Sequence, residues 1–266
     1  MSTPVRLLVL GHKGMLGNAV VKYFSSSPDK YTVVTLASRY GDSSFKFDII
    51  ALSPDYIINC IGKIPQKAPL KDEYKIINIE LPRMLETLGI PIIHPTTDCE
   101  FKGNNNPHYR YSKQDKRDAE DEYGKSKAYI ADEIEKGYRN TKMIRVSIIG
   151  HENTSHVSLL DWFLSQKEPV KGYGHHLWNG ITTLEWSKRA EAIICSWDTF
   201  PILNQYGTEE VYSKYDMLLL FKEVYGVSTE IIYHLEDIYV NKTMISDDAV
   251  ANLKDQLVEL RDFYDK

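Results

Sequence analysis

Short apolar runs, separated by polar or glycine-containing turns, recur along the first 150 residues of the chain. Continuous runs of this kind are typical of parallel strands that are buried on both faces. The segments between several of them carry apolar residues at helical spacing, so the pattern predicts alternating strands and helices. The predicted strands are residues 5–10, 31–36, 56–61, 91–94 and 143–149, and the predicted helices include the run after residue 17, residues 74–88 and a helix that begins near residue 123.

The second half of the chain is less regular and contains no internal repeat or linker. Its pattern predicts helices at residues 158–164, 184–197, 218–224 and 247–264, a strand at 230–233 and a loop at 172–180. We therefore expect a nucleotide-binding domain at residues 1–150. A smaller lobe is expected at residues 151–266, interleaved with the first domain, to which some of its segments return.

Three glycines follow the first predicted strand at a spacing of three residues. In a strand-turn-helix unit, Gly11 permits the tight turn, Gly14 lets the backbone approach a pyrophosphate at the helix N-terminus, and Gly17 allows close packing of helix on strand. An ordinary strand-helix turn is the alternative. The pattern predicts an α/β protein with a Rossmann-type, doubly wound parallel sheet, whose turn contacts the cofactor through Gly11, Lys13, Gly14, Met15, Leu16 and Gly17.

Ser38 and Arg39 follow the second predicted strand, where dinucleotide-binding folds place the residue that meets the adenosine ribose. No acid is present there, and a guanidinium suits a 2′-phosphate, which favours NADP(H) over NAD. A solvated surface arginine is the alternative interpretation. The remaining predicted cofactor contacts are Asp48, Ile49, Cys60, Ile61 and Gly62.

The spacing Tyr-x-x-x-Lys occurs three times, and only Tyr123/Lys127 lies at a plausible helix start. Residues four apart on a helix share one face, and an ammonium beside a phenol favours the phenolate. Such a pair can pass a proton to or from a carbonyl oxygen during hydride transfer. The other two pairs, Tyr109/Lys113 and Tyr138/Lys142, lie near polar or glycine-containing stretches.

Composition narrows the function classes. The 266 residues are 42% hydrophobic, enough for a sizeable core, and a net charge of −5 argues against nucleic acid as a partner. The three cysteines, Cys60, Cys99 and Cys195, have no metal-ligand spacing and suggest a reducing compartment. We expect a cytoplasmic protein without a bound metal or a membrane segment.

Several motifs, in order, resemble those of the extended short-chain dehydrogenases/reductases, in particular the dTDP-4-dehydrorhamnose reductase-like sugar-nucleotide reductases. The resemblance covers most of the chain. It rests on the three glycines, on the run Pro95–Phe101, on Tyr123–Lys127, on Ile144–Ser147 and on Gly180–Thr183.

The resemblance implies that Tyr123 is the general acid, that Lys127 binds the nicotinamide ribose and lowers the tyrosine pKa, and that Thr97 donates a hydrogen bond to the reacting oxygen. It implies NADPH-dependent reduction of the C4 keto group of a nucleotide diphosphate 4-keto-6-deoxy sugar, which supplies deoxysugars for glycan synthesis. Ile148-Ile149 and Thr182 depart from the family pattern on the substrate side, so the sugar and base stay open. The expected substrate contacts are Lys63, Thr97, Asp98, Cys99 and Trp178.

Three alternatives remain open at this point. Cys99 and His156 resemble the epimerisation pair of GDP-fucose synthase, which would make the chain a bifunctional 3,5-epimerase/4-reductase; the other interpretation is a core thiol and a loop histidine. Some proteins of this fold bind NADP as regulatory subunits without catalysis. Trp178 either covers the ligand or supports the interface between lobes. A homodimer is also compatible with the sequence.

Overall fold

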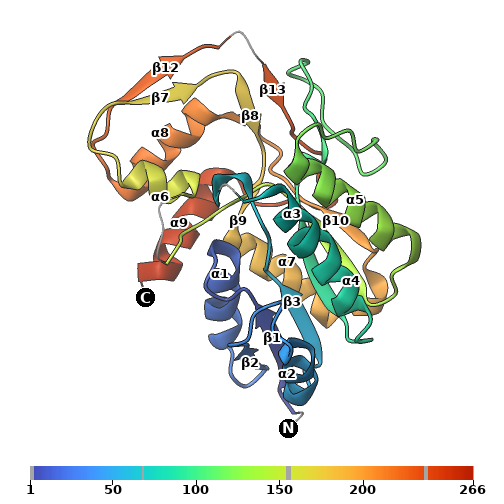
Figure 1. Cartoon of the computed structure of the whole chain (residues 1–266). Helices are drawn as coiled ribbons and strands as arrows, with labels where there is room; N and C mark the ends of the chain where they lie inside the picture. Colours follow the sequence, from blue (N-terminus) through green and yellow to red (C-terminus); the bar gives the residue numbers. More distant parts are fainter. Residues whose placement is uncertain (1–2, 68, 154–156, 237–238, 266) are drawn as a thin grey trace.

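The computed structural model describes residues 3–67, 69–153, 157–236 and 239–265. It has two lobes, with the N-terminus at the base of the larger one (Figure 1). The helices are α1 (Met15–Ser25), α2 (Phe45–Leu52), α3 (Lys71–Tyr74), α4 (Leu81–Glu86), α5 (Glu122–Gly137), α6 (Leu159–Leu164), α7 (Thr183–Cys195), α8 (Lys214–Tyr225) and α9 (Leu253–Asp265). Four short turns of other helix types are η1 (Pro65–Lys67), the π-helix η2 (Lys75–Glu80), η3 (Asp98–Glu100) and η4 (Trp197–Thr199).

A parallel sheet forms the centre of the larger lobe and confirms the predicted fold class. Its strands are β1 (Val5–Leu10), β2 (Tyr31–Thr35), β3 (Tyr56–Asn59), β4 (Ile92–Thr96), β5 (Thr141–Arg145) and β10 (Leu203–Gln205). They lie in the order β10-β5-β4-β3-β1-β2, and neighbouring strands of this sheet run parallel. The edge strand β10 was not expected, because its three residues are too few to give a clear periodic pattern.

The chain adds β2 on one side of β1 and then crosses to add β3, β4, β5 and β10 on the other side, so the strand order reverses between β1 and β3. In open parallel sheets, ligands bind outside the carboxyl ends of the strands at this kind of reversal. Strand β2 is the last in the sheet order and therefore forms the edge on this side, and helix α2 lies in the connection from β2 to β3. The glycine turn after β1 and the turn after β3 therefore lie together at the reversal.

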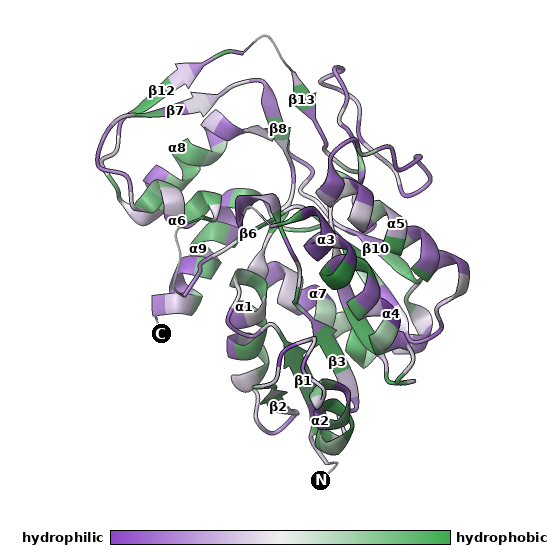
Figure 2. Cartoon of the chain, in the orientation of Figure 1, coloured by the Kyte–Doolittle hydropathy of each residue, from purple (hydrophilic) through white to green (hydrophobic). Residues whose placement is uncertain are grey.

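Side chains of β1 alternate between two hydrophobic cores. Leu7 and Val9 pack in a cluster with residues of α1 and α7, whereas Leu8 and Leu10 pack with residues of α2 and α4. The central strands are accordingly hydrophobic along their length, and polar residues gather on the outer faces of the helices (Figure 2). Burial on both faces explains why the strands read as continuous apolar runs.

The smaller lobe has its own core, formed mainly by α6, α8 and α9. Its other strands are β6 (Ile148–Ile149), β7 (Val170–Tyr173), β8 (His176–Trp178), β9 (Ile181–Thr182), β11 (Tyr212–Ser213), β12 (Ile231–His234) and β13 (Val240–Asn241). The predicted loop at residues 172–180 is wrong, because β7 pairs with β12 and β8 pairs with β11 and β13. These partners are distant in sequence, so local composition did not reveal them.

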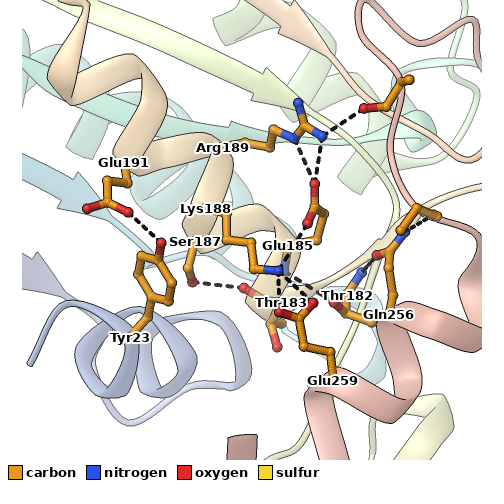
Figure 3. A network of polar contacts seen from close by, with 12 residues as sticks. Tyr23, Thr182, Thr183, Glu185, Ser187, Lys188, Arg189, Glu191, Gln256 and Glu259 are labelled. Carbon is orange, nitrogen blue, oxygen red and sulfur yellow. Dashed lines mark hydrogen bonds and ion pairs between the residues drawn. The ribbon is translucent and has the colours of Figure 1, made fainter. Parts of the chain in front are cut away.

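Helix α7 joins the two lobes through polar contacts with α1 and α9 (Figure 3). Glu191 accepts a hydrogen bond from Tyr23 of α1, and Lys188 forms an ion pair of 2.5 Å with Glu259 of α9. Gln256 of α9 is 1% exposed and accepts a hydrogen bond from the backbone of Thr182, the cap of α7. None of the helices in the described part of the chain is long and apolar enough to span a membrane.

Candidate active site

The glycine turn after β1 has the shape that the sequence predicts. Gly11 has a φ of +75°, and a Cβ there would lie 2.8 Å from the backbone of Cys60. A Cβ at Gly17 would lie 2.2 Å from the carbonyl oxygen of Gly11, so helix α1 can approach the turn only without a side chain. A Cβ at Gly14 would have its nearest neighbour, the carbonyl oxygen of Gly11, 3.5 Å away, so this face of the turn is open. The side chain of Lys13 is exposed beside it, and Met15 and Leu16 begin α1.

The residues expected to contact the adenosine end lie after β2 and in α2. The Ser38 hydroxyl is buried beside the carboxylate of Asp48, and Arg39 is exposed. Asp48 accepts a hydrogen bond of 2.9 Å from Ser44. Ile49 is fully buried in the core, so only its backbone could reach a ligand. The hydroxyls of Ser38 and then Ser44 lower the pKa of Asp48, so these side chains form one polar group at the place expected for the adenosine end.

The turn after β4 and the start of α5 bring Thr97, Cys99 and Tyr123 together. Thr97 donates a hydrogen bond of 2.9 Å to Asp98 and accepts one of 3.1 Å from the backbone of Cys99. A Cβ at Gly124 would lie 2.2 Å from the carbonyl oxygen of Cys99, so the glycine after Tyr123 lets α5 pack directly on the turn. Asp121 caps α5 by accepting a hydrogen bond from the backbone of Gly124.

Burial controls the protonation of this cluster. It raises the pKa of Tyr123 above the ordinary value of a phenol, the neighbouring Cys99 adds to the shift, and the Thr97 hydroxyl opposes it. Burial, followed by the charge of Asp98, raises the pKa of Cys99 to about 12. Both groups are therefore protonated at neutral pH. Lys127 makes no contribution to this shift, because its Nζ is directed toward the carbonyl oxygen of Pro95, and its expected effect on the tyrosine pKa remains a prediction.

Lys127 lies in a buried polar chain that sequence reasoning missed. Its Nζ donates a hydrogen bond of 2.7 Å to the carbonyl oxygen of Pro95 and lies 3.1 Å from Nε2 of His94. The other ring nitrogen of His94 lies 3.2 Å from the amide nitrogen of Asn59, whose oxygen accepts a hydrogen bond from the backbone of Ile61. Burial lowers the pKa of Lys127 to about 8, and burial together with the charge of Lys127 holds the pKa of His94 well below its usual range.

Asn78 connects the turn after β3 to α5. It lies in the π-helix η2 and is 2% exposed. Its side-chain oxygen accepts a hydrogen bond of 2.9 Å from the backbone N–H of Lys63. Its NH2 group donates to the carbonyl oxygen of Lys63 at 3.1 Å and to the hydroxyl of Ser126 at 3.0 Å. The Lys63 side chain forms an ion pair with Glu73. A π-helical turn at this point is consistent with a functional site, where such turns are frequent.

A buried ion cluster supports the floor of the site. Glu100 is fully buried; one oxygen lies 2.6 Å from nitrogens of both Arg117 and Arg145, although the Arg145 contact does not have hydrogen-bond geometry. The other oxygen accepts a hydrogen bond from Thr96. Because Glu100 lies in η3, one turn after Thr97, the cluster holds this segment against β5. The sequence signal, a charged residue inside the predicted strand-turn motif, was present but was not used.

The smaller lobe contributes Trp178 to the same edge of the sheet. Its indole nitrogen donates a hydrogen bond of 2.9 Å to the hydroxyl of Ser147, just after β5. His176, which lies on the same strand as Trp178, has its Nε2 atom 3.5 Å from the carboxylate of Glu236. His156, the second residue of the proposed epimerisation pair, lies outside the described residues.

The other two Tyr-x-x-x-Lys pairs have different surroundings. Tyr109 donates a hydrogen bond of 2.9 Å to Asp115, and Lys113 pairs with Asp247 at 2.8 Å. Lys142 donates to the backbone of Phe200. Two open cavities, of about 480 and 440 Å³, lie away from the Tyr123 cluster. The first is lined by Lys113 and Leu203 and the second by His151 and Tyr264; neither contains a residue of the predicted site, so cavity size alone is a poor guide here.

Comparisons with known proteins agree with the fold. The chain is similar to the solved structure of a dTDP-4-dehydrorhamnose reductase from Bacillus anthracis in complex with NADP, with a TM-score of 0.82, 13% identity and coverage of 97% of this chain and 98% of that one. The structure of a dTDP-4-dehydrorhamnose reductase from Clostridium acetobutylicum has a TM-score of 0.79 and 15% identity, with coverage of 98% of this chain and 100% of that one. The structure of MlghC, a GDP-mannoheptose C4 reductase from Campylobacter jejuni with NADP bound, has a TM-score of 0.76 and 15% identity, with coverage of 100% of both chains.

Identities this low establish a shared fold only, and no curated protein matches the sequence. The family described as "RmlD substrate binding domain" matches residues 5–171, well over half of the chain. This match covers the glycine turn, the Thr97 turn and the Tyr123–Lys127 helix start, and it confirms the resemblance inferred from the motifs. The chain therefore belongs to the RmlD substrate binding domain family.

Proposed function

We propose that the protein is an NADPH-dependent reductase of the C4 keto group of a nucleotide diphosphate 4-keto-6-deoxy sugar. The observation that carries the proposal is the placement of Thr97, Tyr123 and buried Lys127 together at the carboxyl edge of the sheet. The names of the reductases with this fold support the reaction type. The substrate sugar and base are inferred at the level of the class.

The residues around the sheet reversal fit an NADP molecule. The open face at Gly14 suits a pyrophosphate, and the buried Ser38 hydroxyl and the exposed Arg39 guanidinium suit a ribose 2′-phosphate. Gly11, Gly17, Cys60, Ile61 and Gly62 shape the turns, and Asp48 lies next to Ser38 and Ser44 at the adenosine end. When bound, NADPH supplies the hydride.

In this mechanism Tyr123 donates a proton to the C4 oxygen as the carbonyl becomes an alcohol. Its raised pKa keeps the phenol protonated before the reaction. The Thr97 hydroxyl turns from Asp98 to the substrate oxygen and orients it. Lys127, whose Nζ is held by the carbonyl oxygen of Pro95 and by His94, would bind the nicotinamide ribose of the cofactor. Thr97 and Lys127 are buried and Tyr123 is half-buried, and the low exposure of the site to water strengthens these interactions.

The structure favours plain reduction over combined epimerisation and reduction. Epimerisation beside a ketone needs a group that removes a carbon-bound proton, and a thiol with a pKa of about 12 is a poor base at neutral pH. Wild-type protein without NADPH, held with the keto substrate in heavy water, should exchange no deuterium above background. Exchange that Cys99→Ser abolishes would restore the epimerase-reductase alternative.

The direct test is the loss of NADPH absorbance with 4-keto-6-deoxy sugars attached to thymidine, guanosine and uridine diphosphates. We expect turnover with at least one of them. Binding of NADPH without turnover of any of these sugars would instead favour the regulatory-subunit alternative.

A further inference from the structure

Strand β12 is an edge strand at the outer margin of the smaller lobe (Figure 1). It pairs with β7 and with no other strand in the described part of the chain. The carbonyl oxygens of Glu230 and His234 accept hydrogen bonds from the backbone of β7. Backbone groups of successive residues point to opposite edges of a strand, so those of Ile231 and Tyr233 point away from β7. No hydrogen bond to these outward groups is found among the described residues.

The side chains along this edge are apolar and exposed. Ile232 is 48% exposed, Tyr233 is 54% exposed, and Leu235, which directly follows the strand, is 52% exposed. Natural edge strands are usually protected by lysine, by proline or by a covering element, and residues 230–236 contain neither lysine nor proline. An edge with open backbone groups and exposed apolar side chains is a template on which a further strand can add.

The sequence of β12 is complementary to itself when a second copy runs antiparallel. The register that pairs Ile231 with Tyr233 of the second copy joins the outward backbone groups of both strands. It places Ile232 opposite its own copy at a two-fold axis and Glu230 opposite His234. A carboxylate accepts a hydrogen bond from a histidine, and aromatic–β-branched pairs and opposite-charge pairs across strands stabilise sheets.

The neighbouring antiparallel registers lack this complementarity. An axis at Tyr233 places Glu230 opposite Glu236, and like charges directly opposite each other destabilise a sheet. An axis at Ile231 places Glu230 opposite Ile232, where the carboxylate has no polar partner. Charge therefore selects the register that has Ile232 at the axis.

We propose that β12 is a dimer interface, through which two copies of this chain pair antiparallel about a two-fold axis at Ile232. The two small sheets then join into one of four strands, in the order β7-β12-β12-β7, and an isolated two-stranded sheet is only marginally stable. The ring of Tyr233 packs edge-on against Tyr215 of α8, which holds the strand on its own lobe. A single strand pair is a small interface, so we expect a dissociation constant of roughly 1–100 µM.

Sedimentation velocity over protein concentrations of roughly 1 to 300 µM, which bracket that dissociation constant, tests the interface. The wild type should shift from monomer to dimer as its concentration rises. Ile232→Lys should raise the dissociation constant by roughly tenfold or more, because it places two ammonium groups together at the axis. The matched control is Ile245→Lys, the same change at an isoleucine that is 52% exposed and lies outside β12, and it should dimerise like the wild type.

A charge exchange tests the register. His234→Glu places two carboxylates opposite each other at both ends of the pairing, and Glu230→Lys removes the acceptor of the histidine. Each single variant should weaken dimerisation by roughly threefold to tenfold, and the double variant should return to within about threefold of wild type. Thermal unfolding of each variant at low concentration checks that the monomer is folded.

Three results would overturn the proposal. A wild type that stays monomeric over the whole concentration range leaves this edge to another partner. A dimer that Ile232→Lys weakens less than twofold forms through a different surface. A double charge variant that dimerises no better than the single variants shows that Glu230 and His234 do not face each other.

Discussion

Nε2 of His94 lies 3.1 Å from Nζ of Lys127, and the two side chains are only 1% and 6% exposed. The side-chain oxygen of Asn59 accepts a hydrogen bond from the backbone N–H of Ile61, which turns the NH2 group of Asn59 toward Nδ1 of His94. Nδ1 of His94 must therefore accept the hydrogen bond from this NH2 group. The proton of neutral His94 is then on Nε2, facing Lys127. This arrangement favours the uncharged amine of Lys127, in agreement with its lowered pKa.

We therefore expect His94 to be a positioning residue for Lys127. His94→Leu should lower kcat about tenfold and shift the pH dependence of kcat, with little change in KM for the sugar, because Lys127 loses a partner that sets its place and charge. His94→Gln, which keeps a polar atom near Lys127, should recover part of the loss. A pH profile of His94→Leu that superimposes on wild type would contradict this role.

Tyr123→Phe should reduce turnover by roughly a hundredfold or more while NADPH affinity changes little, since only the proton donor is removed. Steady-state rates and fluorescence titration with NADPH measure the two quantities. Tyr109→Phe and Tyr138→Phe are controls with the same spacing to a lysine, and both should stay within a few-fold of wild type. A severe loss in Tyr138→Phe would mean that the site is misplaced.

Arg39→Asp should weaken NADPH binding by roughly tenfold or more and leave NADH binding unchanged or improved, because a charge-assisted contact to the 2′-phosphate is replaced by repulsion. The ratio of the two dissociation constants reports the change. Arg139→Asp, an exposed arginine after α5, is the control for the altered net charge. An unchanged ratio in Arg39→Asp would remove the argument for NADP specificity that rests on this residue.

Lys127→Met should stabilise the protein at pH 7 by roughly 1–3 kcal/mol, because the pKa of about 8 in the folded chain is below the unfolded value of about 10.4. Between these two pKa values the unfolded chain binds more protons, so the wild type gains stability as the pH rises from about 8 to about 10. The advantage of the variant should shrink over that range. Urea unfolding at several pH values measures it, and a pH-independent difference would contradict the pKa.

Glu100→Met should cost about 3–5 kcal/mol of unfolding free energy, because it leaves the fully buried Arg145 without its carboxylate. The double variant Glu100→Met, Arg145→Met should lose less, since no buried charge is then left without a partner. Thermal or urea unfolding compares the wild type, the single variants Glu100→Met and Arg145→Met, and the double variant. A double variant as unstable as the sum of the single variants would show that the two groups do not form a coupled pair.

Much of the larger lobe is encoded locally. Residues 5–17 read as strand, glycine turn and helix because a doubly buried strand is continuously apolar, and because Gly11 and Gly17 meet backbone atoms that no side chain could tolerate. The choice of Tyr123 among three spaced tyrosines also followed from local signals, since the others lie next to polar or glycine-containing stretches. The roles assigned to these residues remain predictions.

Other features depended on contacts between distant residues. Strand β10 exists because Leu203–Gln205 pairs with β5, and β8 exists because segments about 35 and 65 residues away pair with it. The direction of the Lys127 ammonium was decided by the buried carbonyl of Pro95 and by His94, which outweigh the one-turn spacing to Tyr123.

The sequence by itself thus determined the alternation of strands and helices, the family and the candidate acid, because helix and strand periods, glycine turns and short motifs are properties of neighbouring residues. Only the tertiary structure decided which buried groups face one another: Asn59 with His94, His94 with Lys127, and Glu100 with two arginines. The physical reason is that burial and long-range pairing set protonation and charge balance, and neither is a property of a local stretch of chain.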